Sequence, residues 1–487
     1  MMYFSLAKFL QEDLEADYYG IIESHSGVKK FIDEQSVVNF KKTWHFHDHV
    51  FFNNKEPDYE YLNEFEKKYH INLSTVSYSE RAFHPEFNKF HKFTNNEILN
   101  LIERECKLYE QIIDEIQPDI FLANVITRHN NYLLYLLCKS KNIDVLTLES
   151  AKFGNRFTIS NEINKIDNPS LFSSINLSKT RNQEELLHFL KQFKPYKGLE
   201  SKISKKIPRL EKTKAAFNLF TSRKNPQYSK FYTRSKSSLL LKGSSLISSI
   251  HKKNIENFIN KEFEYEIGTK PFIYFSLTSE PERDLLICAP FFTNQISLIT
   301  NIAKSIPVGY YLYVKDHPVM EKIGWRTKDF YKQIMNLPNV KLFHPSIPND
   351  ELIRKSSLVI TVAGTAGFEA AFYKIPSIVF IDADFSVLSS VFTLKNIDNL
   401  PNTISKALTT KVDILELDKY VTYVTEHSFE FNRAEYTSDF NNTFYYVGYG
   451  KLVDIQSDTM KDFLDRNRPI LKNLVVENSK RILDNEK

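Results

Sequence analysis

Residues 339–380 read NVKLFHPSIPNDELIRKSSLVITVAGTAGFEAAFYKIPSIVF, and shortly before them residues 313–320 read YVKDHPVM. Short apolar runs at 310–314, 339–343, 357–362 and 376–381 predict strands. Helices are predicted after Pro348, with Asn349 or Asp350 as the cap, and from about Phe368. Strands that alternate with helices indicate parallel βαβ units, so this stretch predicts a doubly wound α/β sheet.

Polar and glycine-rich segments follow two of these strands, where ligands of such sheets bind. Lys315 and His317 can donate to phosphate oxygens. The turn Gly364-Thr365-Ala366-Gly367 lets the backbone approach a ligand, and the next helix offers N–H groups to an anion. Glu369, in the predicted first turn of that helix, can accept from ribose hydroxyls. Alternatively, the glycines only allow tight packing and Glu369 only complements the helix dipole.

Several motifs carry a resemblance to a known family. In chain order they are FSLTSEPE (275–282), Asn294-Gln295, KDHP (315–318), HPSIPNDELI (344–353) and AGTAGFEA (363–370). This order resembles the capsule and surface polysaccharide biosynthesis proteins, which include GT-B glycosyltransferases such as the Kdo transferases of capsule assembly. The His-Pro pair also resembles the HP motif of bacterial sialyltransferases, which contacts a CMP-sugar. The resemblance is best over about 270–382 and weaker over about 57–160.

The resemblance implies a GT-B-like α/β fold, with two Rossmann-like doubly wound domains facing a cleft and the donor nucleotide on the second domain. Lys315 and His317 would offset charge on the departing phosphate. The turn at 364–367 would hold the same phosphate, and the backbone around Ser346 and Ile347 would contact the base. The predicted nucleotide site comprises Ser276, Thr278, Lys315, His317, Ser346, Ile347, Gly364, Thr365, Ala366, Gly367 and Glu369.

The chain before residue 195 predicts an α/β domain of its own, with a long helix at 95–116 and strands at 18–23, 119–127 and 143–149. Arg128 and His129 follow the strand at 119–127, and Arg156 follows the strand that Glu149 ends. Arg128, His129 and Arg156 are therefore candidates for binding the acceptor. No single catalytic base is identified. The candidate catalytic residues are His317, Lys315, Glu149, His129 and Glu280.

The segment TWHFHDHVFF (43–52) predicts a half-buried aromatic strand with His45, His47 and His49 on one face. Alternating histidines can bind a metal ion, but no carboxylate or cysteine is placed to complete a ligand set. The sequence also has no D-x-D motif in a place that suits a metal site, so we expect no required metal ion and no cofactor. A role for one of these histidines in a substrate cleft is the alternative that stays open.

Shifts in composition predict four regions. They are an acceptor-side α/β domain (1–195), a basic helical connector (196–265), a nucleotide-sugar-binding α/β domain (266–405) and a helical extension that packs back across the domains (406–487). Within that extension, 413–430 or 457–484 would return to the first domain. Lys and Arg gather at 197–253, most densely at Lys205, Lys206, Arg209, Lys212, Lys214, Arg223 and Lys224. They would attract anionic lipid or an acidic glycan, or merely solvate a connector.

The whole chain has 487 residues, enough for two or three domains, and a nearly balanced net charge of +4. This charge argues against binding nucleic acid over the whole chain. Three scattered cysteines indicate a reducing compartment. The N-terminus turns acidic too soon for a signal peptide, and no apolar run approaches the ~20 residues of a membrane span. We expect a cytoplasmic protein, attached at most to the inner face of the plasma membrane.

The leading functional hypothesis is a glycosyltransferase of capsular or surface polysaccharide biosynthesis. It would transfer a sugar from a CMP- or UDP-sugar to a glycan or a lipid-linked acceptor. One alternative is an isomerase similar to the UDP-GlcNAc 2-epimerases, which share this fold. The other is a non-catalytic component of a polysaccharide assembly complex.

Overall fold

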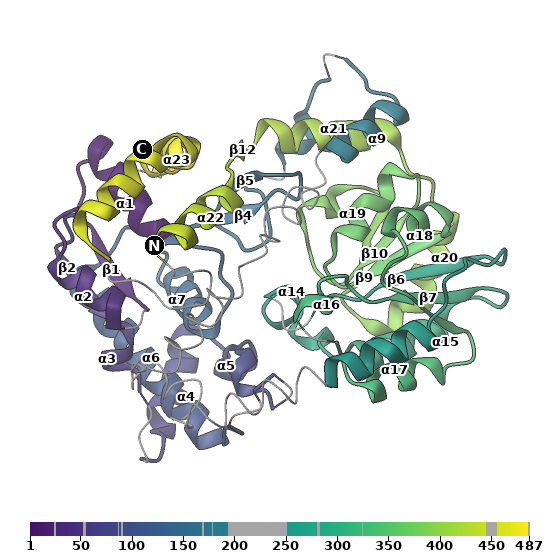
Figure 1. Ribbon diagram of the computed structural model, residues 1–487, viewed down its shortest axis with the longest axis horizontal. Helices are drawn as coiled ribbons and strands as arrows, with labels where there is room; N and C mark the ends of the chain where they lie inside the picture. The colour runs from purple at the N-terminus through teal and green to yellow at the C-terminus, as the bar shows by residue number, and fades with distance from the viewer. Residues whose placement is uncertain are drawn as a thin grey trace, which may run out of the picture. The chain divides into compact units, whose positions relative to one another are not determined.

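A computed structural model describes residues 1–23, 26–51, 55–85, 87–88, 91–167, 170–177, 179–192, 251–279, 283–323, 325–444 and 455–485. They form two compact units, which Figure 1 shows coloured along the chain. The first unit contains Met1–Asn161 and the residues from Ser428 onward. The second contains the described residues between Glu162 and His427.

The second unit is built on a parallel sheet. Its strands are β6 (Phe272–Ser276), β7 (Tyr311–Lys315), β8 (Val340–Phe343), β9 (Leu358–Thr361), β10 (Ser377–Val379) and β11 (Val391–Thr393). Their order is β11-β10-β9-β6-β7-β8, so the chain proceeds to one side from β6 and then crosses to the other side with β9. The predicted doubly wound α/β class is confirmed here, and the strand order reverses between β6 and β9.

Burial explains why these strands could be read from the sequence. All residues of β6 and β9 are buried, as expected for central strands of a parallel sheet that is covered on both faces. On one face Phe272 stacks on Tyr313 with ring centroids 4.1 Å apart, and Tyr313 contacts Phe343 at 4.5 Å. These rings, with Leu352, Val359 and Ala370, form part of one buried cluster.

The helices of the second unit are α8 (Leu171–Ser174), α9 (Gln183–Gln192), α14 (Arg283–Leu286), α15 (Gln295–Ser305), α16 (Met320–Ile323), α17 (Lys328–Met335), α18 (Asn349–Lys355), α19 (Thr365–Phe372), α20 (Leu400–Thr409) and α21 (Ile414–Glu426). They lie between its strands, except that α8 and α9 precede β6 and that α20 and α21 follow β11. Short 3₁₀ turns lie at Pro290–Phe292, Asp384–Val387 and Ile397–Asn399.

Two predicted helix starts are wrong by a few residues. α18 begins at Asn349 after Pro348, and the Asn349 side chain accepts from the Tyr274 hydroxyl at 3.3 Å instead of capping the helix. α19 begins at Thr365, three residues before the predicted start, because the Gly364 backbone already has an extended N-cap conformation. Glu369 is therefore in the second turn of α19, where the interaction of its carboxylate with the helix dipole is weaker than in the predicted first turn.

The first unit is also α/β, with a mixed sheet. Its strands are β3 (Ile120–Ala123), β4 (Asp144–Ser150), β5 (Arg156–Ser160) and β12 (Phe429–Glu430) in the order β12-β5-β4-β3, and β1 (Tyr19–Ile22) pairs with β2 (Lys42–His45). β3 and β4 are parallel, whereas β5 and β12 run antiparallel to their neighbours. The predicted α/β class is confirmed for this unit as well.

The helices of the first unit surround these strands. They are α1 (Met2–Asp13), α2 (Ser26–Glu34), α3 (Phe46–His49), α4 (Tyr59–Tyr69), α5 (Leu73–Tyr78), α6 (Asn95–Ile116), α7 (His129–Ser140), α22 (Arg433–Phe444) and α23 (Ser457–Asn485), with a 3₁₀ turn at Arg81–Phe83. α6 has the predicted bounds. Thr94 and Glu97 form a capping box at its start, and Gln117 ends it in the left-handed conformation.

The predicted strand at 43–52 is wrong beyond His45. The chain turns into the short helix α3, in which Phe46 and His47 are both buried while His49 is exposed. In this helical turn Phe46 and His47 are buried together, whereas the next two residues are exposed. His45 contacts Asp33 at 2.6 Å, and the three histidines do not share a face.

The division into units differs from the boundaries expected from composition. Residues 181–192 pack with the second unit, where the Arg181 Nε donates to the buried Asp418 at 2.5 Å. Glu264 donates its backbone N–H to Leu342 at the edge of β8, so that sheet edge includes a residue expected in the connector. Residues 193–250, which hold most of the predicted basic connector, lie outside the described residues.

The C-terminal segment returns to the first unit through only one of the two predicted stretches. α21 belongs to the second unit, whereas α23 packs on α1, as Figure 1 shows for the yellow and purple helices. The Arg468 guanidinium contacts Glu12 at 2.7 Å and lies over the Phe9 ring at 4.3 Å. Residues 457–484 therefore return as predicted, and most of 413–430 does not.

Candidate functional site

The carboxyl edge of the second sheet gathers most of the predicted nucleotide site. In register, Ser276 of β6 lies opposite Lys315 of β7 on one side and Thr361 of β9 on the other. The Thr361 hydroxyl donates to the Ser276 carbonyl at 3.2 Å. The segment after β7 and the segment after β9 thus begin on either side of β6. This is the point at which doubly wound sheets bind ligands.

Lys315 is almost completely buried at the end of β7. Its Nζ donates to the Ile347 carbonyl in the loop between β8 and α18, with the two atoms 2.5 Å apart. Burial lowers the pKa of Lys315 to about 8, against the opposing effect of Asp350 and Glu369. Lys315 therefore holds the loop at Ile347, which was predicted to contact the nucleotide base. It also interacts electrostatically with Glu369, the residue predicted to bind the ribose.

That loop has a second anchor. His344 Nδ1 lies 2.6 Å from the Ser346 hydroxyl and accepts from the Ser346 backbone N–H at 3.2 Å. His344 Nε2 lies 2.9 Å from the Asn260 side-chain oxygen, and its ring stacks on Tyr265 at 4.6 Å. Ser346 and Ile347 are thus held from both sides, which preorganises their backbone groups.

His317 is half-buried, and its position depends on the preceding residue. Asp316 accepts from the His317 backbone N–H at 2.8 Å, and His317 Nδ1 accepts from the Val319 N–H at 3.2 Å. Since Nδ1 is an acceptor, the neutral ring carries its proton on Nε2, which can donate to a ligand. Burial, together with Lys315 and Arg326, lowers the pKa of His317 despite the nearby Asp316.

A buried network next to His317 was missed from the sequence. Arg326 Nε donates to Asp316 at 3.2 Å, and the Tyr331 hydroxyl donates to Asp316 at 2.7 Å. Arg326 Nη2 also donates to the Thr278 carbonyl, 2.6 Å away in the loop after β6. The KDHP motif pointed to Asp316, but nothing in the local pattern indicated that Arg326, ten residues later, would pair with it.

The turn after β9 has the close contacts that its glycines predicted. The Gly364 N–H donates to the Thr361 hydroxyl at 3.2 Å, and a Cβ on Gly364 would lie only 2.7 Å from that oxygen. A Cβ on Gly367 would lie 3.0 Å from Val379 Cγ1, so Gly367 allows α19 to pack on the sheet. Contacts within the protein thus explain both glycines, as the packing interpretation expected, and the ligand interpretation stays a prediction.

The remaining predicted residues of this turn lie on α19. The Thr365 hydroxyl donates to Glu369 at 3.0 Å across one helical turn, and Ala366 is buried against the sheet. Thr365 thus bonds to Glu369, which interacts electrostatically with Lys315, while Ala366 can offer only its backbone.

His129 of the first unit does not suit the roles predicted for it. It is fully buried, with Nδ1 2.6 Å from Glu80 and Nε2 2.8 Å from Glu105. Burial opposes the charged ring, but Glu105 and Glu80 raise the pKa of His129 to about 10. Burial would raise the pKa of Glu80, but the contact with His129 opposes burial and helps to lower this pKa to about 2. Both ring nitrogens of the charged His129 donate to glutamates, so neither can accept a proton as a base. The buried ring also cannot reach an acceptor, so the catalytic and acceptor-binding predictions for His129 are wrong.

The two predicted acceptor-binding arginines have partners within the first unit. Arg128 Nη1 donates to Glu23 at 2.6 Å. Arg156 Nε donates to the Ser428 hydroxyl at 2.8 Å, and this residue lies just before β12. Arg156 therefore attaches the returning chain to β5, which a reading of local sequence could not reveal. Nothing in these contacts indicates an acceptor.

Of the other candidate bases, Glu149 is described and Glu280 lies outside the described residues. Glu149 is buried near the end of β4, where it accepts from the Thr147 hydroxyl at 3.2 Å. Its backbone is paired with Thr158 of β5. Glu149 stays a predicted candidate.

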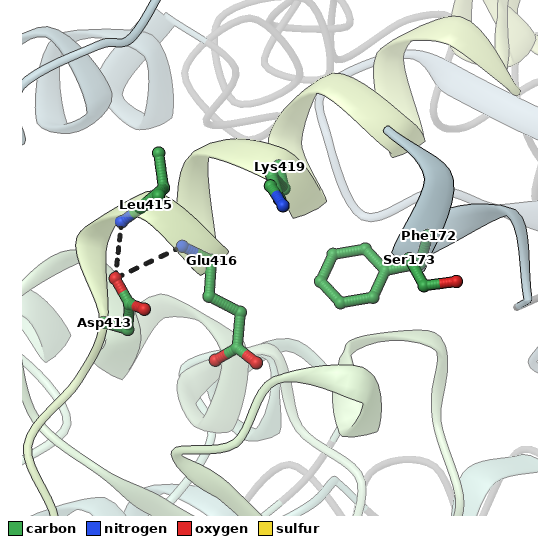
Figure 2. Close-up of a pocket in the computed structure, with 6 residues that line it drawn as sticks. All are labelled: Phe172, Ser173, Asp413, Leu415, Glu416 and Lys419. Atoms are coloured by element: carbon green, nitrogen blue, oxygen red, sulfur yellow. Dashed lines mark hydrogen bonds between the residues drawn. The ribbon is translucent and has the colours of Figure 1, made fainter. Parts of the chain in front are cut away.

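Figure 2 shows a hollow in the second unit that is distinct from this sheet edge, lined by Phe172, Ser173, Asp413, Leu415, Glu416 and Lys419. Its carboxylates already have partners. Asp413 accepts from the first backbone N–H groups of α21, and Glu416 accepts from Ser389 at 2.6 Å. These two carboxylates therefore serve to hold α21 in place, and the candidate site is the sheet edge.

The described residues contain no group of three or more His, Cys, Asp or Glu side chains that could hold a metal ion. None of the helices in this part of the chain is long and apolar enough to cross a membrane.

Part of the chain is similar to a known protein family, and the chain is also similar to several solved structures. Residues 184–389 match the family described as "Capsule polysaccharide biosynthesis protein". No curated protein sequence matches the chain. Among solved structures, KpsC of Thermosulfurimonas dismutans, a beta Kdo 2,7 transferase, is 10% identical with a TM-score of 0.31, over 83% of this chain and 89% of that chain.

Another similar structure is the UDP-GlcNAc 2-epimerase of Methanocaldococcus jannaschii in complex with UDP-GlcNAc and UDP. It is 12% identical with a TM-score of 0.23, over 84% of this chain and 100% of that chain. The match to the family model covers less than half of the chain, and it includes the stretch at 270–382 where the sequence motifs resemble the same family.

Proposed function

We propose that the protein is a glycosyltransferase of capsular or surface polysaccharide biosynthesis, of GT-B type, with its nucleotide-sugar donor bound at the β6/β9 edge of the second unit. The observation that carries the proposal is the position of the two motif segments. They lie on either side of β6, where the strand order reverses, in the part of the chain that matches a capsule family.

In this proposal the donor phosphate lies near His317 and the N-terminus of α19. His317 Nε2–H and the N–H groups of α19 would stabilise charge that develops on the departing phosphate. The buried Lys315 would add positive potential while it holds the loop at Ile347 in place. Glu369 would accept from the ribose, and the backbone of Ser346 and Ile347 would contact the base.

The first unit would supply the binding site for the acceptor, which would be a glycan or a lipid-linked glycan. Glu149 is the described residue of this unit that we propose as the candidate base, since it lies near the end of β4 and since His129 is buried with both ring nitrogens bonded to glutamates. Products distinguish transfer from isomerisation, because an epimerase converts the nucleotide sugar without an acceptor and a transferase releases the nucleotide.

Nucleotide binding is the first test. We expect one of CMP, UDP or GDP, or its sugar, to raise the thermal unfolding midpoint, because a ligand that binds only the native state stabilises it by about 2.7 kcal/mol at 100 times its Kd. EDTA should leave the shift unchanged, since no metal is proposed. Absence of a shift with every nucleotide and nucleotide sugar would contradict the proposed function.

Attachment to an anionic membrane surface through 197–253 is a further expectation of this function. Each basic residue near anionic lipid contributes about 1 kcal/mol at low salt. Wild-type protein should therefore co-sediment with anionic liposomes, and replacing Lys205, Lys206, Arg209 and Lys212 by Gln should abolish this binding and leave activity on a soluble acceptor intact. If the wild type and the Gln variant co-sedimented equally, or if the wild type did not co-sediment at all, the result would support the interpretation that 197–253 is only a connector.

A further inference from the structure

The buried hydroxyl of Thr278 has no hydrogen-bond partner among the residues that the structure describes. The residue lies two positions beyond β6 and is 6% exposed. Within the described part of the chain, its Oγ1 is buried without a hydrogen bond. Burying a hydroxyl without a partner costs free energy, and such atoms in native proteins call for an explanation, one of which is an absent ligand.

The backbone of the same residue is held unusually firmly. The Gln295 side chain accepts from the Thr278 N–H at 2.9 Å and donates to the Thr278 carbonyl at 3.0 Å. Arg326 Nη2 donates to that carbonyl as well, at 2.6 Å. Gln295 and Arg326 are both buried, and Asp316 holds Arg326 by an ion pair of 3.2 Å. We call Gln295, Arg326 and Asp316 the Thr278 clamp.

The clamp explains a motif that the function above did not use. Asn294 caps α15 by accepting from the Ser297 N–H at 3.0 Å, which places Gln295 at the first turn of that helix. The pair Asn294-Gln295 thus starts α15 and directs an amide to the loop after β6. Through Asp316 the clamp also reaches the segment that carries His317, since Asp316 accepts from the His317 backbone N–H.

We propose that the Thr278 hydroxyl donates a hydrogen bond to an anionic phosphate oxygen of the bound nucleotide, and that the Thr278 clamp positions it for this contact. The proposal rests on the proposed function. Thr278 follows β6, next to the point where the strand order reverses, and Ser276 of the same strand is bonded to Thr361 at the start of the turn before α19. The backbone N–H and carbonyl of Thr278 already have partners, so its hydroxyl is the group left to bind a ligand. A hydroxyl can donate to an anionic oxygen, which is an acceptor only.

The test compares Thr278→Val with Thr278→Ser, in the full chain, with the nucleoside diphosphate that stabilises the wild type most and with the corresponding nucleoside. We expect Thr278→Val to weaken diphosphate binding about 10- to 100-fold, as for loss of a hydrogen bond to a charged group, and to leave nucleoside binding unchanged. The ligand-free valine variant should be as stable as the wild type or more stable, because an unpartnered hydroxyl is removed. Thr278→Ser should retain diphosphate affinity.

Ser377 provides a matched control. It is another buried residue whose hydroxyl has no partner within the described chain, but it lies at the amino end of β10, away from the ligand edge. Ser377→Ala should therefore leave both affinities unchanged while ligand-free stability is unchanged or higher. A loss of diphosphate affinity in this variant equal to that of Thr278→Val would overturn the proposal, because the effect would not be specific to Thr278.

Arg326→Lys tests the clamp separately. A lysine keeps the charge next to Asp316 but lacks the planar fork that bonds Asp316 and the Thr278 carbonyl together. We expect faster hydrogen exchange of the amides around Thr278 in the ligand-free protein and a severalfold loss of diphosphate affinity, with nucleoside affinity unchanged. Unchanged exchange and unchanged affinity would show that the clamp does not position Thr278.

The outcomes separate this proposal from the proposed function. If the wild type and Thr278→Val bind the diphosphate equally, the hydroxyl is no ligand and the nucleotide site still stands. If Thr278→Val weakens diphosphate and nucleoside alike, the contact is not to the phosphate. If the wild type binds no nucleotide, the proposed function and this proposal both fail.

Discussion

Replacing His129 by alanine should lower the free energy of unfolding of the first unit by about 3–5 kcal/mol, the range for removing one partner of a buried ion pair. The variant leaves Glu80 and Glu105 buried without the imidazolium that both contact. Urea unfolding followed by a probe in the first unit measures the effect. His49→Ala, at an exposed histidine of the same unit, should change it by less than about 0.5 kcal/mol.

The pH dependence gives this prediction a second measurement. The pKa of His129 is about 10 in the folded unit, above its unfolded value, so its stabilisation is fully present below pH ~6.5 and is lost as pH rises towards 10. The pKa of Glu80 is about 2, so its contribution is present above pH ~4.5 and is lost as pH falls towards 2. The stability difference between wild type and His129→Ala should therefore shrink between pH 7 and 10. A difference that is constant over this range, or a stable alanine variant, would contradict the ion-pair interpretation.

Replacing His317 by alanine should lower turnover about 10²- to 10³-fold, as for loss of one donor to a developing anion. Folding stability should change little, because the ring is half-buried and the described contact that it accepts is from the Val319 N–H at 3.2 Å. Single-turnover rates with the donor nucleotide sugar and a thermal unfolding midpoint measure both quantities. His188→Ala, at an exposed position on α9, is the control and should alter neither.

The pKa of His317 sharpens this second prediction. Burial lowers it, so the ring is neutral at pH 7 and donates through Nε2–H. If the neutral ring is the active form, wild-type turnover should hold down to below pH 6.5 before this group titrates. An alanine variant that unfolds at a much lower temperature yet keeps its full specific activity would show that His317 is structural.

The segments that the sequence predicted correctly share a local cause. β6, β7, β8 and β9 are buried on both faces, so they appear as short continuous apolar runs, and α6 carries a capping box and a left-handed residue at its ends. The turn at Gly364 also follows from local constraints, since a side chain there would clash with Thr361 three residues before it. From these elements alone, the strand ends that carry the candidate nucleotide site could be predicted.

The errors arose where a residue's partner is distant in sequence. His129 looked like a site residue because it follows a strand, but Glu80 and Glu105, which come from two other segments, bury and charge it. The alternation of histidines at 45, 47 and 49 predicted a strand, and nothing local shows that Phe46 and His47 are buried in a short helix instead.

The sequence by itself determined the α/β class, the order of strands and helices in the second unit and the segments that end at its carboxyl edge, because apolar period, caps and glycine geometry are properties of neighbouring residues. Only the tertiary structure decided which strands lie beside β6, that α23 packs on α1, and that Asp316 pairs with Arg326 to hold Thr278. These features depend on contacts between residues far apart in the chain. Their free energy comes from burial and charge pairing that no local pattern encodes.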